Sequence, residues 1–169
     1  MPPKVDSLGR VPGLGLVAEA GYFYRRPDDP PLPADPAAAL ASSKGHDSDH
    51  WTTLVSNDSM SMSWKQVATA VMHVYMERTH GVYIQQNESA VVWQFRDADP
   101  EFAMLQSKEL EDQLKGLLKH LNVEVIRGDD YIEARPCGVS KAAFIQNTLT
   151  ELYSEDPPDF ILCIGDDAR

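Results

Sequence analysis

The chain has 169 residues, of which 43% are hydrophobic and 24% are charged. These fractions are near the average of globular proteins, so they exclude a wholly disordered chain, and the length suits one ordinary domain. The formal net charge of −11 argues against a nucleic-acid or anionic-membrane surface, because such surfaces need clustered Lys and Arg. No apolar run reaches the ~18–20 residues of a membrane span, and the first residues lack the apolar centre of a signal peptide. We therefore expect a cytoplasmic protein.

The first third of the chain is rich in turn-forming residues. Residues 15–24 read as a short buried strand followed by a turn. Residues 27–50 combine many prolines and aspartates with a polar stretch, and proline removes the backbone donors that helices and central strands need. We expect a disordered insert there.

Hydrophobic periodicity becomes clear beyond this insert. Apolar residues at three- and four-residue steps predict an amphipathic helix that ends at Gly81, with a buried face of Trp64, Val67, Ala68, Val71, Val74 and Tyr75. Residues 82–86 and 90–95 then alternate as two strands of a hairpin.

A second helix and a second hairpin follow. Asp99 is a candidate N-cap, with Pro100 in the first helical position. The expected buried face of this helix consists of Leu110, Leu114, Leu117, Leu118 and Leu121. Residues 123–127 and 131–135 form the second hairpin, so residues 64–135 predict an αββαββ unit, an antiparallel sheet covered on one face by two helices.

The last thirty residues have a different character. Ser140 is a candidate cap for a helix over residues 141–153, with Ile145, Leu149 and Leu152 buried. Residues 160–164 are continuously apolar, which is typical of a strand buried on both faces of a parallel α/β sheet. Ligands of such sheets bind beyond the carboxyl ends of the strands, where Asp166 and Asp167 follow.

Few side chains suggest chemistry by themselves. Asp166 and Asp167 offer the hard oxygen ligands that Mg²⁺ prefers, and a solvated acidic segment explains them equally well. Lys141 stands at a helix start, where it can present an ammonium to a phosphate or lie on the surface like most lysines. Residues 46–50 contain His and Asp, but ordering that segment around a metal would cost entropy, so we expect no metal site there.

Several sequence blocks together resemble one family. They are Leu14–Phe23, Tyr75–Thr79, Glu88–Trp93, Arg96–Phe102, Lys108–Leu110, Glu133–Pro136, Gly138–Lys141 and Phe160–Asp167. In this order they resemble the trehalose-6-phosphate phosphatase domain at the C-terminal end of eukaryotic trehalose-phosphate synthase proteins. That family belongs to the haloacid dehalogenase superfamily, whose Rossmann-like core carries an inserted αββαββ cap. The resemblance implies core fragments at residues 1–26 and 138–169, and a cap at residues 51–137.

The resemblance also implies a chemistry. In the family an aspartate of an Asp-x-Asp motif attacks the phosphate of trehalose-6-phosphate, and water hydrolyses the aspartyl-phosphate. By resemblance Lys141 stabilises the negative charge, Asp166 and Asp167 hold Mg²⁺, and Glu133 grips the trehalose hydroxyls. A trehalose-phosphate synthase domain is the implied protein partner.

The departures from the family pattern bear on activity. The sequence has no Asp-x-Asp-x-Thr motif. Gln85 and Asn87 stand where active relatives carry Glu and Lys, and Gln94 stands in place of a His. We therefore expect a fragment of a Mg²⁺-dependent phosphatase of trehalose biosynthesis that is inactive alone. The alternative is a non-catalytic regulatory or sugar-phosphate-sensing domain.

Overall fold

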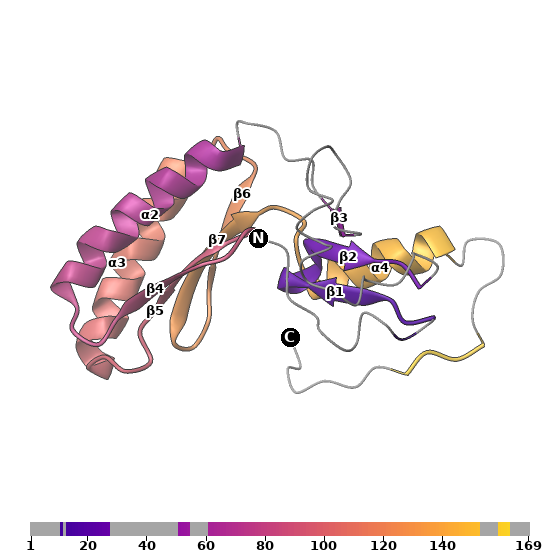
Figure 1. Ribbon diagram of the computed structural model, residues 1–169. Coiled ribbons are helices and arrows are strands. Elements are labelled where there is room, and N and C mark those ends of the chain that lie inside the picture. The colour runs from indigo at the N-terminus through magenta and orange to yellow at the C-terminus, as the bar shows by residue number, and fades with distance from the viewer. Residues whose placement is uncertain (1–10, 12, 28–50, 55–60, 153–158, 163–169) are drawn as a thin grey trace, which may run out of the picture.

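The computed structural model describes residues 11, 13–27, 51–54, 61–152 and 159–162. In chain order its elements are β1 (Leu16–Ala18), the 3₁₀ helix η2 (Glu19–Gly21), β2 (Phe23–Arg25), β3 (Thr52–Thr53), α2 (Ser61–Arg78), β4 (Tyr83–Gln86), β5 (Val91–Gln94), α3 (Pro100–Leu118), β6 (Val123–Arg127), β7 (Tyr131–Pro136) and α4 (Lys141–Leu152). They form two units (Figure 1): the αββαββ unit, residues 61–136, and the small unit, which comprises β1, η2, β2, β3 and α4. Within the described ranges, no helix combines the length and apolarity that a bilayer crossing needs.

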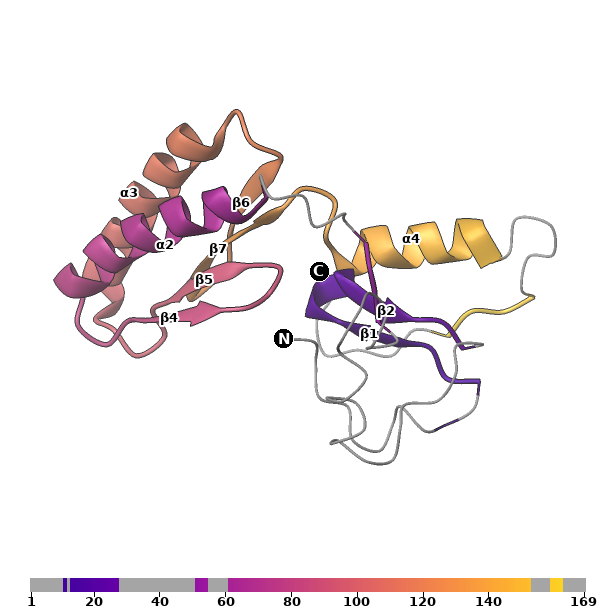
Figure 2. The same cartoon turned by 45° about the horizontal axis from the view of Figure 1, so that its top comes forward.

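The αββαββ unit confirms the predicted order of elements. Its four strands form an antiparallel sheet in the order β4-β5-β7-β6. Helices α2 and α3 lie side by side on one face of this sheet (Figures 1 and 2). The second hairpin is joined to the first through β5 and β7, strands that are separated in the sequence by the whole of α3.

Two of the expected helix faces need correction. In α2 the core contains Trp64, Ala68, Met72 and Tyr75, whereas Val67 and Val74 are each 43% exposed. In α3 the buried positions are Ala103, Ser107, Leu110, Leu114 and Leu118, whereas Leu117 is 50% exposed and Leu121 lies beyond the helix. One residue turns an α-helix by about 100°, so Leu117 and Leu118 cannot both face the sheet squarely.

The start of α3 and the connection after α2 each depend on one residue that the sequence singled out. The Asp99 side chain accepts a hydrogen bond of 2.9 Å from the Phe102 amide and caps α3, as expected. After α2, Gly81 adopts a φ of 86° in the connection to β4. A side chain there would meet the Asp97 carbonyl oxygen at 2.3 Å, so both the conformation and the space require glycine.

The small unit is built around a separate apolar cluster. Its antiparallel sheet has the order β1-β2-β3, and the cluster consists of Tyr22, Phe23 and Val139, with Ala18 and Trp51 packed against it. The sequence predicted one strand and a turn in residues 15–24, and the structure has two strands separated by η2. Strand β3 was not predicted. It pairs with β2 and so adds residues 52–53 to this sheet.

Helix α4 packs on the small unit through a different side chain than expected. The Ser140 hydroxyl accepts a hydrogen bond of 3.0 Å from the Ala143 amide, which confirms the predicted cap. The ring of Phe144 lies 5.5 Å from that of Tyr24, measured between centroids, whereas Ile145 is 45% exposed. The helix therefore turns Phe144 toward the sheet.

The expected buried strand at residues 160–164 does not form in its described part. Phe160, Ile161 and Leu162 are 77%, 50% and 69% exposed and belong to no strand. A strand buried on both faces needs hydrogen-bonded neighbours, and β1, β2 and β3 pair among themselves. The prediction was wrong for these three residues. Asp166, Asp167 and residues 28–50 of the expected insert lie outside the described residues.

Candidate functional site

The uncovered face of the four-stranded sheet is the candidate site. Helices occupy the opposite face, and in both views the uncovered face turns toward the small unit (Figures 1 and 2). Successive side chains of a strand point to opposite faces of a sheet. In β7, Ile132 and Ala134 belong to the core beneath the helices, so Glu133 between them lies on the uncovered face. We call this surface the open face.

Glu133 lies in a row of four residues across the open face. Strand pairing sets Gln85 opposite Val92, Val92 opposite Glu133, and Glu133 opposite Ile126. The two direct neighbours of the carboxyl are therefore the apolar Val92 and Ile126. Val92 is itself only 6% exposed. This setting removes water from the carboxyl, and burial accordingly raises the pKa of Glu133 above its ordinary value.

Two charged side chains beside Glu133 have opposite effects on the pKa of its carboxyl. Arg135 lowers the pKa of Glu133 and Glu124 raises it, both by less than burial does. The Arg135 Nε donates a hydrogen bond of 2.8 Å to the Glu124 carboxylate. That ion pair ties the guanidinium to β6 and leaves the Glu133 carboxyl as a partly desolvated acceptor on the open face. Carboxyl groups with such shifted pKa values are enriched at binding and catalytic sites.

The first hairpin presents neutral amides to the same face. Ile84 packs toward the core, so Gln85 next to it points to the open face, and Gln94 does so from β5 beside the core residue Trp93. The Gln85 Nε2 donates a hydrogen bond of 3.1 Å to the Asn87 Oδ1. The amide groups of Gln85 and Asn87 therefore hold each other at the end of β4, and neither carries a charge.

Lys141 belongs to the small unit. It is the first residue of α4, directly after the cap residue Ser140, and it is exposed. Unpaired amides at a helix N-terminus and an ammonium together favour an anion. The Lys141 side chain forms no hydrogen bond or ion pair in the described part of the chain, and Glu133 lies on the other unit. Asp166 and Asp167 fall outside the described residues, among which no group of three or more His, Cys, Asp and Glu could hold a metal ion.

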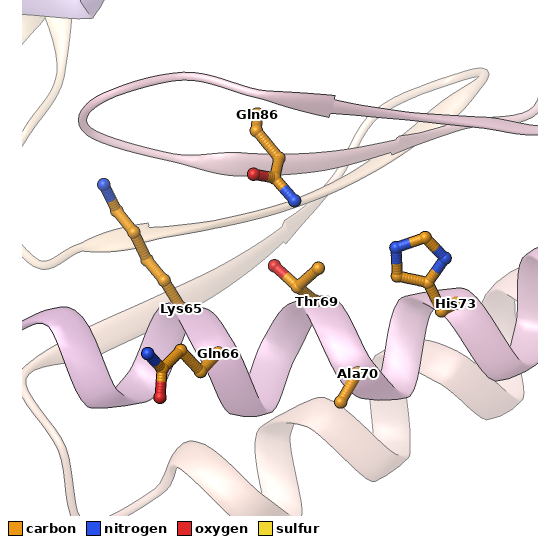
Figure 3. Close-up of a pocket in the computed structure, with 6 residues that line it drawn as sticks. All are labelled: Lys65, Gln66, Thr69, Ala70, His73 and Gln86. Carbon is orange, nitrogen blue, oxygen red and sulfur yellow. The ribbon is translucent and has the colours of Figure 1, made fainter. Parts of the chain in front are cut away.

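A pocket of about 460 Å³ lies at the edge of the sheet, on the side of the helices (Figure 3). Lys65, Thr69 and His73 line it from successive turns of α2, and Gln86 faces them from the edge strand β4. The four-residue spacing along α2 is the signal that could have predicted this row of polar side chains. Gln86 points to the opposite side of the sheet from Gln85, so this pocket is separate from the open face.

The comparison with known families decides the identity of the chain. The model of the trehalose-phosphatase family matches residues 2–169. The chain belongs to the trehalose-phosphatase family. The family prediction made from the sequence blocks is thereby confirmed.

Curated members of the trehalose-phosphatase family are longer proteins. The chain is 37% identical to UDP-forming alpha,alpha-trehalose-phosphate synthase 6 of Arabidopsis thaliana over 91% of its own length and 16% of that protein. It is 32% identical to a trehalose-phosphatase of Schizosaccharomyces pombe over 93% of its length and 17% of that protein. The chain thus spans about one sixth of the length of these relatives.

A solved structure supports the fold. The C-terminal domain of a trehalose-6-phosphate phosphatase from C. albicans matches 90% of this chain and 48% of that domain, with a TM-score of 0.68 and 28% identity. The mixed α/β fold class of the trehalose-phosphatase family, with its helix-covered antiparallel sheet, is therefore confirmed.

Proposed function

We propose that the αββαββ unit is the cap of a trehalose-6-phosphate phosphatase and that its open face binds the sugar. The observation that carries this proposal is the position of Glu133, a partly desolvated carboxyl between apolar neighbours on the face that turns toward the small unit. A carboxylate accepts hydrogen bonds from sugar hydroxyls, and a poorly hydrated one loses less water when it does so.

The small unit is proposed to contribute to the phosphate side of the site. Residues 1–26 and 138–169 would belong to the core, as the resemblance implies, with Lys141 contributing positive charge at the start of α4. The carboxylates of Asp166 and Asp167 are hard oxygen donors and suit Mg²⁺, which would neutralise phosphoryl oxygens when bound. A trehalose-phosphate synthase domain is the proposed protein partner, because such synthases are among the relatives.

We further propose that the 169 residues do not hydrolyse the ester by themselves. They contain no Asp-x-Asp-x-Thr motif, so the nucleophile of the family mechanism has no counterpart among them. Binding of the sugar and orientation of the phosphate are the steps that the residues of this chain can support.

One observation favours the alternative, a non-catalytic domain that senses the sugar phosphate. The two hairpin positions that carry Glu and Lys in active relatives are the amides Gln85 and Asn87, and these two side chains are hydrogen-bonded to each other. A neutral amide pair can still bind hydroxyl groups, but it cannot neutralise a charged substrate. The sensing function would keep the sugar contact and dispense with turnover.

Calorimetry with trehalose-6-phosphate and a phosphate-release assay with Mg²⁺ test these proposals on residues 1–169. We expect binding without phosphate release, and about tenfold or greater loss of affinity in Glu133→Ala, since a hydrogen bond to a charged group contributes about 1.5–3 kcal/mol. Glu109→Ala removes an exposed carboxylate from the helical side of the same unit and should bind like the parent chain. Absence of binding would refute the sugar-binding proposal, and phosphate release by the parent chain would refute the inactivity.

A further inference from the structure

The Glu19 carboxylate of the small unit contacts the αββαββ unit. The Glu19 carboxylate of η2 accepts three hydrogen bonds from the turn between β4 and β5: 2.7 Å from the Ser89 amide, 2.6 Å from the Ser89 hydroxyl and 3.3 Å from the Glu88 amide. One oxygen receives both Ser89 donors and the other receives the Glu88 amide. Ser89 is only 4% exposed, and its two hydrogen bonds to Glu19 are partly buried, whereas the bond from the Glu88 amide is exposed.

The backbone that presents Glu19 is strained. Glu19 has a φ of 48° and Ala20 a φ of 56°, and both lie in the left-handed region that residues other than glycine rarely adopt. Two such residues in succession persist only where surrounding interactions hold them. The three hydrogen bonds to the hairpin turn are interactions of this kind, since they fix the direction of the Glu19 side chain.

A lysine of the αββαββ unit supports the same contact. The Lys65 ammonium of α2 donates to the backbone carbonyl groups of Asn87 and Glu88, in the same turn whose amides donate to Glu19. Burial lowers the pKa of Lys65, and the nearby Glu19 carboxylate raises it. The turn is thus bound both by an ammonium of its own unit and by a carboxylate of the small unit.

We propose that Glu19 is a positioning residue that fixes the αββαββ unit against the small unit and keeps the open face turned toward it. The chain itself passes between the units at residues 54–61 and again between β7 and α4, and the apolar clusters of the two units share no residue. No shared core therefore fixes the described parts of the two units against each other, and Glu19 makes three polar contacts between them with one side chain.

Hydrogen exchange of residues 1–169 provides a direct test. In Glu19→Ala, we expect the Ser89 amide to exchange at least about tenfold faster, because it loses a charge-assisted hydrogen bond. Amides of Trp93 and Ile132 in the core should keep their rates. In Ser89→Ala, the amide at position 89 should exchange less rapidly than in Glu19→Ala, because the two amide donors to Glu19 remain. In Ser89→Thr, this amide should exchange at the parent rate, because threonine keeps the hydroxyl group. Unchanged exchange at Ser89 in Glu19→Ala would overturn the proposal.

Inter-unit distances distinguish positioning from simple stabilisation. Spin labels at Glu77→Cys on α2 and Asn147→Cys on α4, in a chain with Cys137→Ser and Cys163→Ser, should give one narrow distance distribution. Glu19→Ala should broaden it, whereas Glu151→Ala, which removes an exposed ion pair with Arg26 inside the small unit, should not. An unchanged distribution in Glu19→Ala would refute positioning. This experiment needs no sugar phosphate, so it tests the positioning role of Glu19 independently of the proposed function.

Discussion

At the scale of single residues, the Glu133 carboxyl that we propose for sugar binding also lowers the stability of the fold. Burial raises the pKa of its carboxyl above the ordinary value of 4.5, so the folded chain holds this proton to a higher pH than the unfolded chain does. As the pH rises through the interval between the two pKa values, the unfolded chain releases its proton first, and stability is lost. At neutral pH, where the unfolded chain has released this proton, burial of the Glu133 carboxyl therefore destabilises the folded αββαββ unit.

Replacing this carboxyl by an amide of the same shape should remove the penalty. We expect Glu133→Gln to raise the melting temperature at pH 7 and to lose this advantage as the pH falls below about 4.5, the ordinary pKa of Glu. Thermal melts between pH 3.5 and 8 measure the difference, with Glu109→Gln on the exposed side of α3 as the control for removing a negative charge. A constant difference between Glu133→Gln and the parent at all these pH values would contradict the sign of the pKa shift.

Among the elements, two glycines on the same unit should respond in opposite directions to the same substitution. Gly81 has a φ of 86° and no room for a side chain beside Asp97, whereas Gly116 lies in the last turn of α3 with nothing within 4 Å of a new Cβ atom. Gly81→Ala should therefore destabilise the chain by about 2 kcal/mol or more. Gly116→Ala should stabilise it by about 0.5–1 kcal/mol, since alanine is the better helix former.

Urea denaturation of the two alanine variants and the parent checks both signs in one experiment. Because the substitution is identical, its effect on the unfolded chain is nearly the same, and the difference between the variants reports the folded backbone. Equal stability of the two variants would mean that the connection from α2 to β4 relaxes around the added methyl group.

The elements also show what periodicity can predict. The spacing of apolar residues locates α2, α3 and both hairpins, because each signal is local. The same spacing misjudges parts of the helix faces. In α2, Met72 is fully buried and Val74 is exposed, and in α3 the polar Ser107 is buried with its hydroxyl donating a hydrogen bond to the Met104 carbonyl. Alternation along β7 predicts the side of Glu133, and the hairpin pattern predicts its pairing with β6, but its neighbour Val92 comes from pairing with β5, which no local pattern specifies.

The contact between the units also could not be predicted from local sequence patterns. Glu19 and Ser89 are seventy positions apart, and nothing in the letters around Glu19 indicates a left-handed backbone. The short strand β3 escapes prediction because its two residues gain their conformation only by pairing with β2. At residues 160–162 the error is the reverse: the apolar run predicts a strand that does not form. A strand-like sequence forms a strand only where partner strands are available.

At the scale of the whole molecule, the two apolar clusters determine how the chain unfolds. All members of the larger cluster lie between Trp64 and Ala134, and the smaller cluster draws only on residues outside this range. A unit that contains its entire core can fold by itself. We therefore expect residues 61–136, expressed alone, to melt in one cooperative transition, and the 169-residue chain to show this transition together with a separate one from the small unit.

Point variants assign the two transitions of the whole chain. Leu114→Ala removes a fully buried side chain from the larger cluster and should lower that melting temperature alone, because a Leu→Ala change in a core costs about 2–5 kcal/mol. Phe23→Ala should lower only the transition of the small unit. Calorimetry of the parent and both variants measures this directly. If Leu114→Ala lowered both transitions equally, the two units would unfold as one cooperative unit. Three hydrogen bonds at Glu19 are too few to explain such coupling, so this result would contradict the prediction of two separate cores.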